Sequence, residues 1–563
     1  MEKIIIYQVL PRLFGNTTEN CVPNGTLEQN GVGKFSDFTP ERLKEIKGLG
    51  TTHIWYTGVI EHATATNYSQ YGIIPDNKYV VKGLAGSPYA IKDYYDIDPD
   101  LADDVPSRVA EFEALIARTH EAGMKVIMDF VPNHVARQYA SDSAPEGVVD
   151  LGGEDNNNWA FSPLNNFYYL PGQTFAPSFS TGEGDERYNE FPAKVTGNDC
   201  FTSAPSINDW YETIKLNYGI DYTTGWRHFD PIPNTWFKMR DILLFWAAKG
   251  VDAFRCDMAE MVPVEFWEWC IAQVQEKYPE MIFIAEVYNP NEYYNYVKRG
   301  GFTYLYDKVG LYDTLKDVVR GQHTGAITRW WQSIGHVKEN MLHFTENHDE
   351  QRSASQFFAG NPHRAFPLFA LSTLIDGNPI MLYFGQELGE TATDAEGFSG
   401  ADGRTTIFDY WSVPTVRQWM KKGLRGLTAE QKEIRNKYKK LLNIAAKEKG
   451  ISDNGLFFDL MYVNGNNDAI STGRSYLFAR CYKKDLYIVA VNFRSQDAEL
   501  NINIPSHLFD YFKLTEGEYN CKELISGVKE VRNLSQTEQF TVNLTSYETA
   551  IWKCTKKNNC FVT

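Results

Sequence analysis

Four apolar runs of strand length along this chain each end in a cluster of polar residues. They are residues 125–134 (KVIMDFVPNH), 251–260 (VDAFRCDMAE), 283–288 (FIAEVY) and 341–350 (MLHFTENHDE). A parallel strand that is buried on both faces is typically a continuous apolar run. In a (β/α)8 barrel, the reactive groups lie at the carboxyl ends of such strands. Packing alone does not explain three non-adjacent carboxylates in this series, so the pattern predicts a barrel with a polar site at one end.

Strand and helix patterns alternate through the first 450 residues. Residues 4–14 and 52–60 are expected to form strands, and residues 39–50 and 105–124 are expected to form helices. The first of these helices has a Thr-Pro start and a Gly stop, as helix boundaries often do. The alternation predicts an α/β protein with a parallel sheet.

Two segments depart from this alternation. Residues 135–234 are rich in Gly, Asn, Pro, Ser and aromatic residues, and an unstructured loop of that length is improbable in a compact protein. From about residue 456 onward, short alternating strands replace helical periodicity. We therefore predict a barrel formed by residues 1–134 and 235–455, an irregular domain of residues 135–234 inserted after the third strand, and a C-terminal all-β sandwich of residues 456–563.

Composition narrows the possible partners. The net charge is −17, from 55 basic and 72 acidic residues, and no basic run stands out. This balance argues against nucleic acid and anionic membrane surfaces as partners. Aromatic residues make up 14% of the chain, which suits binding of carbohydrate because sugar faces stack on aromatic rings.

The N-terminus and the cysteines bear on location. The apolar run that begins at Ile4 already matches a barrel strand, so we interpret it as structural and not as a signal peptide. The eight cysteines lie far apart, without CxxC or zinc-like spacing, which predicts free thiols. No apolar stretch reaches the roughly 20 residues of a membrane span. These features predict a cytoplasmic protein with no membrane association.

The order of the four motifs resembles that of the α-amylase family of glycoside hydrolases (family 13). The matching elements are DxxxNH, then FRxD, then a strand-end Glu, then NHD. The resemblance covers most of the chain, from IIIYQVLPRLF through SPYAIKDYYDIDPDLA to MLYFGQELG at residues 381–389. It implies the same barrel, the same insertion after the third strand and a C-terminal β domain.

The motifs supply the two groups that acetal cleavage requires. One acid protonates the leaving oxygen, and one carboxylate faces the anomeric carbon; a separation of about 5–5.5 Å leads to retention of configuration. Adjacent strand ends, about 4.8 Å apart, give about that separation. By resemblance, Asp257 is the nucleophile, Glu286 the general acid/base and Asp349 the third carboxylate that holds sugar hydroxyls. Arg255, on the same face as Asp257, is expected to lower the pKa of that carboxyl.

The resemblance also implies a set of residues that bind the sugar at the cleaved bond. His134 and His348 match the family's two histidines that hydrogen-bond this sugar, and Tyr89 matches the aromatic residue that stacks beneath it. The implied substrate-binding residues are therefore Tyr89, His134, Arg255 and His348.

The chain departs from the family pattern on the leaving-group side. Many α-amylases have Lys-His three and four residues after the nucleophile, where this chain has Glu260 and Met261. We expect that side to depend instead on the inserted domain, with Asn217, Tyr218 and the aromatic residues 167–169 as candidates.

No metal or other cofactor is expected to be required. Asn133 matches a family calcium ligand, so calcium there is the alternative. A hard cation needs six or more oxygen ligands, and the sequence identifies only this one. We therefore expect activity to survive chelation.

The sequence thus predicts a retaining hydrolase of α-glucosidic bonds in starch-derived maltooligosaccharides. A transglycosylase or isomerase would use the same covalent chemistry and remains an alternative, distinguished by whether water or a sugar resolves the intermediate. A second alternative is a non-catalytic member, such as the barrel ectodomains attached to amino-acid transporters. Those proteins lack the carboxylates and carry a membrane span, whereas this chain keeps the carboxylates.

Overall fold

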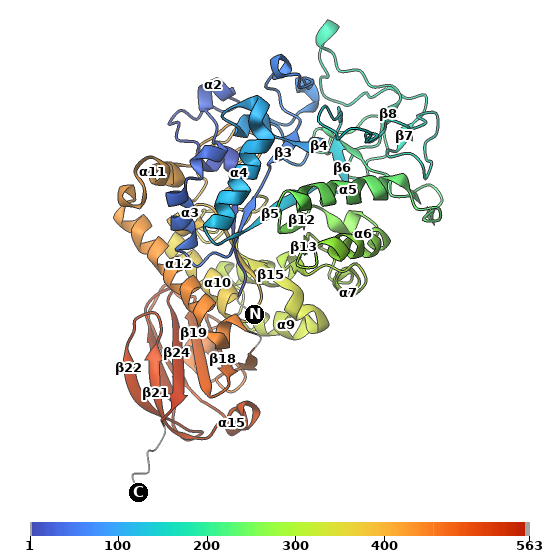
Figure 1. The fold of residues 1–563 in the computed structure, drawn as a ribbon. Helices are drawn as coiled ribbons and strands as arrows, with labels where there is room; N and C mark the ends of the chain where they lie inside the picture. Colours follow the sequence, from blue (N-terminus) through green and yellow to red (C-terminus); the bar gives the residue numbers. More distant parts are fainter. Residues whose placement is uncertain (1–2, 454, 558–563) are drawn as a thin grey trace.

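Eight parallel strands close into a barrel in the computed structural model, which describes residues 3–453 and 455–557 (Figure 1). Each strand pairs in parallel with both neighbours, which confirms the predicted (β/α)8 barrel. In chain order, the strands are β1 (Ile5–Val9), β2 (His53–Tyr56), β5 (Lys125–Phe130), β12 (Ala253–Cys256), β13 (Ile282–Ala285), β14 (Tyr304–Tyr306), β15 (Met341–Phe344) and β16 (Ile380–Tyr383).

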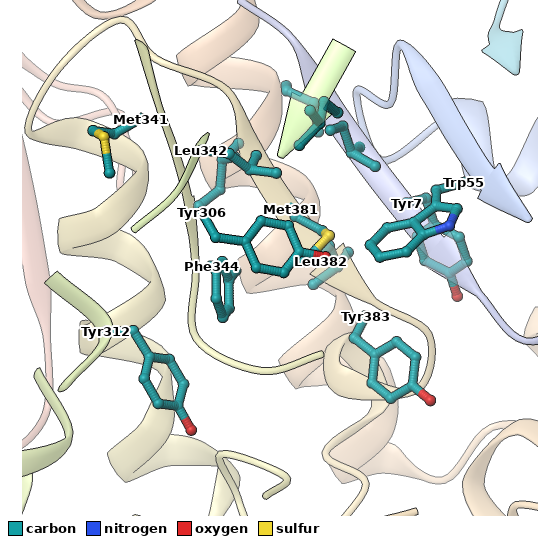
Figure 2. Close-up of a cluster of buried hydrophobic side chains, with 14 of the residues drawn as sticks. Tyr7, Trp55, Tyr306, Tyr312, Met341, Leu342, Phe344, Met381, Leu382 and Tyr383 are labelled. Atoms are coloured by element: carbon teal, nitrogen blue, oxygen red, sulfur yellow. The ribbon is translucent and has the colours of Figure 1, made fainter. Parts of the chain in front are cut away.

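Side chains from several strands meet in the buried core. Figure 2 shows Tyr7 from β1 and Trp55 from β2 in the same region as Tyr306 from β14 and residues of β15 and β16. The rings of Tyr306 and Phe344 lie 5.1 Å apart. Because helices cover the outer face, the strands are buried on both sides, which explains their continuous apolar runs.

Helices surround the barrel as the sequence pattern predicts. Thr39 accepts a hydrogen bond from the backbone N–H of Arg42 and so caps the first long helix after β1. No helix among residues 3–453 and 455–557 is long and apolar enough to cross a membrane. The principal helices are α3 (Pro40–Lys47), α4 (Arg108–Glu121), α5 (Asn234–Ala248), α6 (Val264–Lys277), α10 (Pro362–Leu374) and α12 (Ala429–Lys447).

The segment after β5 forms the irregular insertion, seen as the teal and green loops beside the barrel in Figure 1. The beginning of the insertion is joined to a later part of it where β6 (His134–Ala136) pairs with β9 (Thr213–Lys215). Wholly buried Arg137 donates hydrogen bonds to Tyr211 O and Thr213 O and pairs with Glu190. Hydrogen bonds to one buried guanidinium therefore order a segment that has little regular structure.

Antiparallel sheets form the C-terminal region, as predicted for an all-β sandwich. The smaller sheet lies against the larger one, where the rings of Phe540 and Trp552 are 5.7 Å apart. Two short helices, α14 (Asp468–Ser471) and α15 (Ser506–Phe512), interrupt the strands and were not expected. The larger sheet contains β17 (Leu456–Asp459), β18 (Ser475–Tyr482), β19 (Asp485–Asn492), β24 (Thr549–Lys556), β21 (Gly517–Glu523) and β22 (Lys529–Leu534), and the smaller contains β20 (Ala498–Ile502) and β23 (Phe540–Leu544).

A buried histidine links two segments of the barrel. The Nδ1 atom of His343 on β15 lies 3.3 Å from Asp307 Oδ2, and its Nε2 atom lies 2.8 Å from Asp376 Oδ2. Burial opposes the charged ring, but the two carboxylates outweigh it and raise the pKa of His343 from 6.5 to about 9. The charged histidine therefore favours the folded state.

This pair of contacts predicts a pH-dependent contribution to stability. Because the folded-state pKa lies above the unfolded one, the contribution is complete below pH 6.5 and is lost as the pH rises through 9. Substitution His343→Gln should lower the free energy of unfolding by about 3 kcal/mol at pH 6, and by much less at pH 10. Urea denaturation at both pH values measures this difference, and an equal loss at both would contradict the ionic role.

Candidate active site

A cavity of about 260 Å³ lies at the carboxyl ends of the barrel strands, beside the inserted domain. Five of the seven predicted site residues line it, and the other two, Arg255 and His348, lie directly behind them. The lining residues are Lys82, Ser87, Tyr89, His134, Trp210, Glu212, Thr213, Asp257, Met258, Glu286, Tyr288, Asp349, Ile407 and Phe408.

The guanidinium of Arg255 bridges the two carboxylates on adjacent strands. Its Nη1 donates to Asp257 Oδ1 at 2.9 Å, and its Nη2 donates to Glu286 Oε2 at 2.6 Å. In the register of β12 and β13, Cys256 lies opposite Ala285, so the two carboxylates follow side by side at the strand ends. The two carboxylates therefore follow neighbouring strands, which lie about 4.8 Å apart.

Glu286 has two further donors that sequence reasoning did not identify. The hydroxyl of Tyr288 donates to its Oε1 atom, and the backbone N–H of Met258 donates to its Oε2 atom at 2.8 Å. Met258 has φ 41°, a left-handed conformation that costs free energy for a residue with a side chain. The turn after Asp257 therefore holds an N–H toward Glu286. Tyr288 lies two residues after Glu286, and that spacing was the available signal.

The expected effect of Arg255 on Asp257 is present but is outweighed. Burial, the largest influence, raises the pKa of Asp257 well above its ordinary value, and the nearby carboxylates of Glu286 and Asp349 raise it further. Arg255 acts in the opposite direction. The expected direction of the effect of Arg255 is therefore confirmed, but the net pKa of Asp257 is raised, because burial dominates and several carboxylates share one cation.

His348 positions two of the lining residues. Its Nε2 atom lies 2.9 Å from Asp349 Oδ2 and accepts or donates a hydrogen bond with the Tyr89 hydroxyl. The two rings stack with centroids 5.1 Å apart. Gln8 contacts the other ring nitrogen at 2.8 Å. Partial desolvation of Asp349, whose side chain is 39% exposed, opposes its charged form, but His348 and Arg255 hold the pKa of that carboxyl below its ordinary value, so Asp349 is ionised.

The inserted domain reaches the cavity through residues that sequence reasoning passed over. The ring of Trp210 lies 5.1 Å from that of His134, and Glu212 pairs with Lys82 at 3.1 Å. Both Trp210 and Glu212 lie in the WYETIKLNYG segment that drew attention to Asn217 and Tyr218. The beginning of this segment faces the cavity, and its end does not.

The residues expected on the leaving-group side are therefore corrected. Asn217 is wholly buried, and the hydroxyl of Tyr218 donates to Pro132 O at 2.6 Å. Within the aromatic residues 167–169, the Tyr168 hydroxyl donates to Ile220 O and that of Tyr169 to Asp155 Oδ2. These rings are buried and belong to the apolar core of the insertion. None of them lines the cavity.

The two residues that replace Lys-His also lie outside the cavity. Glu260 Oε2 accepts a hydrogen bond from the backbone N–H of Asn289 at 3.0 Å, and Met261 ends the short helix that follows Asp257. Neither lines the cavity.

The surroundings of Asn133 do not fit a calcium ion. Its Oδ1 atom accepts a hydrogen bond from Lys215 Nζ at 2.8 Å, and the same ammonium lies 2.6 Å from Asp199 Oδ1. Lys215 is 2% exposed, so its charge occupies the space between these oxygens. A divalent cation would be repelled by this ammonium and would find its oxygen ligands already engaged.

Fold and site together define a (β/α)8 enzyme that carries carboxylates at its strand ends. The model of the family described as "Alpha amylase, catalytic domain" matches residues 8–458. The chain therefore belongs to the alpha-amylase family, and it is a glycoside hydrolase.

Individual relatives agree with this assignment. Alpha-amylase 3 of Dictyoglomus thermophilum is 24% identical over 547 residues, which cover 93% of this chain and 91% of that protein. An alpha-1,4-glucan:maltose-1-phosphate maltosyltransferase of Cereibacter sphaeroides is 46% identical over 57 residues, 10% of each chain. The crystal structure of a maltogenic alpha-amylase, AmyB from Thermotoga neapolitana, has the same fold, with a TM-score of 0.61 and 18% identity over 98% of this chain and 99% of that one.

Two substitutions in the inserted domain test which of its residues contact the substrate in the cavity. Trp210→Ala removes a ring that lines the cavity and should lower kcat/KM for maltoheptaose by about tenfold or more, by analogy with other stacking contacts. Tyr168→Phe removes only the hydrogen bond to Ile220 O, so it should lower the thermal midpoint. Its kcat/KM should change less than about twofold on maltoheptaose and on an aryl α-glucoside alike. A selective loss of kcat/KM on maltoheptaose in Tyr168→Phe would instead support the expectation that the aromatic residues 167–169 bind the leaving-group side of the substrate.

Proposed function

We propose that this enzyme hydrolyses α-glucosidic bonds in maltooligosaccharides with retention of configuration. The observation that carries the proposal is the single buried guanidinium that bridges Asp257 and Glu286 at adjacent strand ends of the cavity. Adjacent strands lie about 4.8 Å apart, which is close to the separation of about 5–5.5 Å at which the carboxylate attacks the anomeric carbon directly.

In the first step, Asp257 attacks the anomeric carbon while the bond from that carbon to the leaving oxygen breaks. Glu286 gives its proton to the leaving oxygen. In the second step, Glu286 takes a proton from water as the water oxygen attacks the anomeric carbon, and the ester bond to Asp257 breaks. Each residue returns to its starting state.

The surrounding donors control where the proton lies. Arg255 stabilises negative charge on either carboxylate, and Tyr288 and the Met258 N–H stabilise it on Glu286 after proton transfer. In this proposal, Asp349, His348, His134 and Tyr89 bind the sugar at the cleaved bond. Trp210 and the Lys82–Glu212 pair form the wall contributed by the insertion and the neighbouring loop.

A transferase remains the second candidate because one relative is a maltosyltransferase. Transfer uses the same first step, and a sugar hydroxyl replaces water in the second. Products formed from maltose, maltoheptaose, panose, pullulan and trehalose distinguish the two functions. Shorter sugars alone support hydrolysis, and new, longer or rearranged oligosaccharides would indicate transfer.

Substitution of the two carboxylates should separate their roles. Asp257→Asn should abolish turnover on every substrate, since no other carboxylate can form the glycosyl intermediate. Glu286→Gln should still react with an α-glucosyl fluoride, whose leaving group needs no proton, while losing activity on maltooligosaccharides. Steady-state rates on both substrates measure this. If Glu286→Gln cleaves the fluoride no better than the oligosaccharide, the assignment of the acid is wrong.

We further propose that no calcium ion is bound at Asn133, because Lys215 supplies the positive charge there. Turnover at 25 °C should therefore survive EDTA treatment with little loss. Lys215→Met should lower the thermal midpoint, since Asp199 and Asn133 lose their buried partner. Inactivation of the wild type by EDTA that calcium reverses at 25 °C would contradict this proposal.

A cytoplasmic location is also proposed, with an oligosaccharide as the partner. The described cysteines are free thiols, which is usual in a reducing compartment, whereas Cys560 lies outside the described residues. Solved relatives carry acarbose or maltose, which supports a carbohydrate ligand for this chain.

A further inference from the structure

A largely buried ion pair lies at one side of the cavity. Lys82 is in the loop between β3 (Ile60–His62) and β4 (Ile91–Ile97), and Glu212 is in the insertion. Lys82 Nζ lies 3.1 Å from Glu212 Oε2, and the two side chains are only 10% and 5% exposed. Both residues line the cavity. Their contact therefore joins the loop after β3 to the insertion at the edge of the cavity.

The Lys82 loop also packs closely on the segment that follows β16. Gly83 has φ 67°, and a Cβ atom at this position would lie 2.1 Å from Phe408 O, so the approach requires a residue without a side chain. The backbone N–H of Ala85 donates to Phe408 O at 3.2 Å. Phe408 lines the cavity as well. Glu212, Lys82 and Phe408 therefore belong to one continuous surface, the closed wall.

The position of the closed wall relative to Glu286 indicates which part of the substrate meets it. Lys82 comes after β2, Phe408 comes after β16, and these two strands flank β1 in the barrel. β1 lies opposite β13, which Glu286 follows directly. In the proposed function, Glu286 protonates the leaving oxygen, so the leaving group lies on the β13 side. The sugars on the other side of the cleaved bond, toward the non-reducing end, therefore extend toward the closed wall.

The chemistry of the ion pair suits the hydroxyl groups of a terminal sugar. Glu212 Oε2 accepts no well-directed hydrogen bond from any described residue, although Lys82 Nζ lies beside it. A hydroxyl group can donate to a carboxylate and accept from an ammonium, so one sugar can engage both partners. The cavity of about 260 Å³ is also smaller than the about 300–1,000 Å³ of pockets that enclose drug-sized ligands, which suits the end of a chain.

We propose that this enzyme acts from the non-reducing end of its substrate, because the closed wall of Lys82, Glu212 and Phe408 stops the chain beyond its terminal sugars. The inference rests on the proposed function, since it specifies which part of a maltooligosaccharide the same cavity binds. The ion pair binds the terminal hydroxyl groups, and the closed wall excludes a chain that continues past them. A groove open at both ends would instead bind the middle of a chain.

Two forms of maltoheptaose test the proposal. One is unmodified, and the other carries an ethylidene group across two hydroxyls of the sugar at the non-reducing end. The blocked form should be cleaved with a kcat/KM at least about a hundredfold lower, because its end does not fit against the closed wall. The first products from the unmodified form should be one short sugar and the correspondingly shortened chain. Similar kcat/KM values for both forms, or a broad mixture of first products, would overturn the proposal.

Binding to Asp257→Asn, which is expected to lack turnover, separates this inference from the proposed function. Isothermal calorimetry should show that the unmodified form binds at least about tenfold more tightly than the blocked form. If the wild type hydrolyses neither form while Asp257→Asn still distinguishes them, the hydrolytic function fails and recognition of the chain end stands. Equal binding of the two forms, or binding of neither, contradicts recognition of the chain end.

Substitution of the ion pair tests its part in closing the cavity. Lys82→Ala combined with Glu212→Ala shortens both side chains and leaves no buried charge unpaired. This double variant should raise the ratio of kcat/KM on blocked to unmodified maltoheptaose by at least about tenfold. The matched control is Lys78→Ala with Glu186→Ala, an exposed pair 3.0 Å apart that joins the same loop to the insertion and should leave the ratio unchanged. A wild-type ratio in the folded Lys82/Glu212 variant, checked by its thermal midpoint, would overturn the role of the ion pair.

Discussion

The buried charge of Arg255 is the interaction on which the cavity depends. Its guanidinium contacts Asp129, Asp257 and Glu286 at once, and no part of the residue is exposed. The rings of Trp55, Tyr89 and Tyr306 lie within 5.4 Å of it and exclude water. Without this cation, the carboxylates would have no buried counter-charge, which is far more costly than losing an exposed ion pair. The barrel is therefore the framework that allows several carboxylates to lie close together.

The junction between barrel and insertion follows the same principle. Arg137 orders the loops of the insertion through hydrogen bonds to backbone carbonyls, and Lys215 lies between Asn133 and Asp199. An irregular segment has few apolar contacts from regular packing, so buried cations with many acceptors do much of its ordering.

Most of the barrel could be predicted from the sequence, because strands covered on both sides are continuous apolar runs that end in polar clusters. β14 was missed because it has only three residues, too few for a periodic signal. Helix α15 was missed for a similar reason, since seven residues between strands show barely two turns. The residues at strand ends were predictable because a parallel barrel places all carboxyl ends at one edge.

The sequence by itself determined which residues meet at that edge, since the order Asp257, Glu286, Asp349 follows from strand order alone. Only the tertiary structure decided which face of an irregular segment reaches the cavity. Trp210 and Glu212 line it, while Asn217 and Tyr168 are buried in the insertion, and no periodicity distinguishes them. Burial, too, depends on the whole fold. Its effect on the pKa of Asp257 exceeds that of the neighbouring Arg255, because desolvation is set by everything packed around the carboxylate.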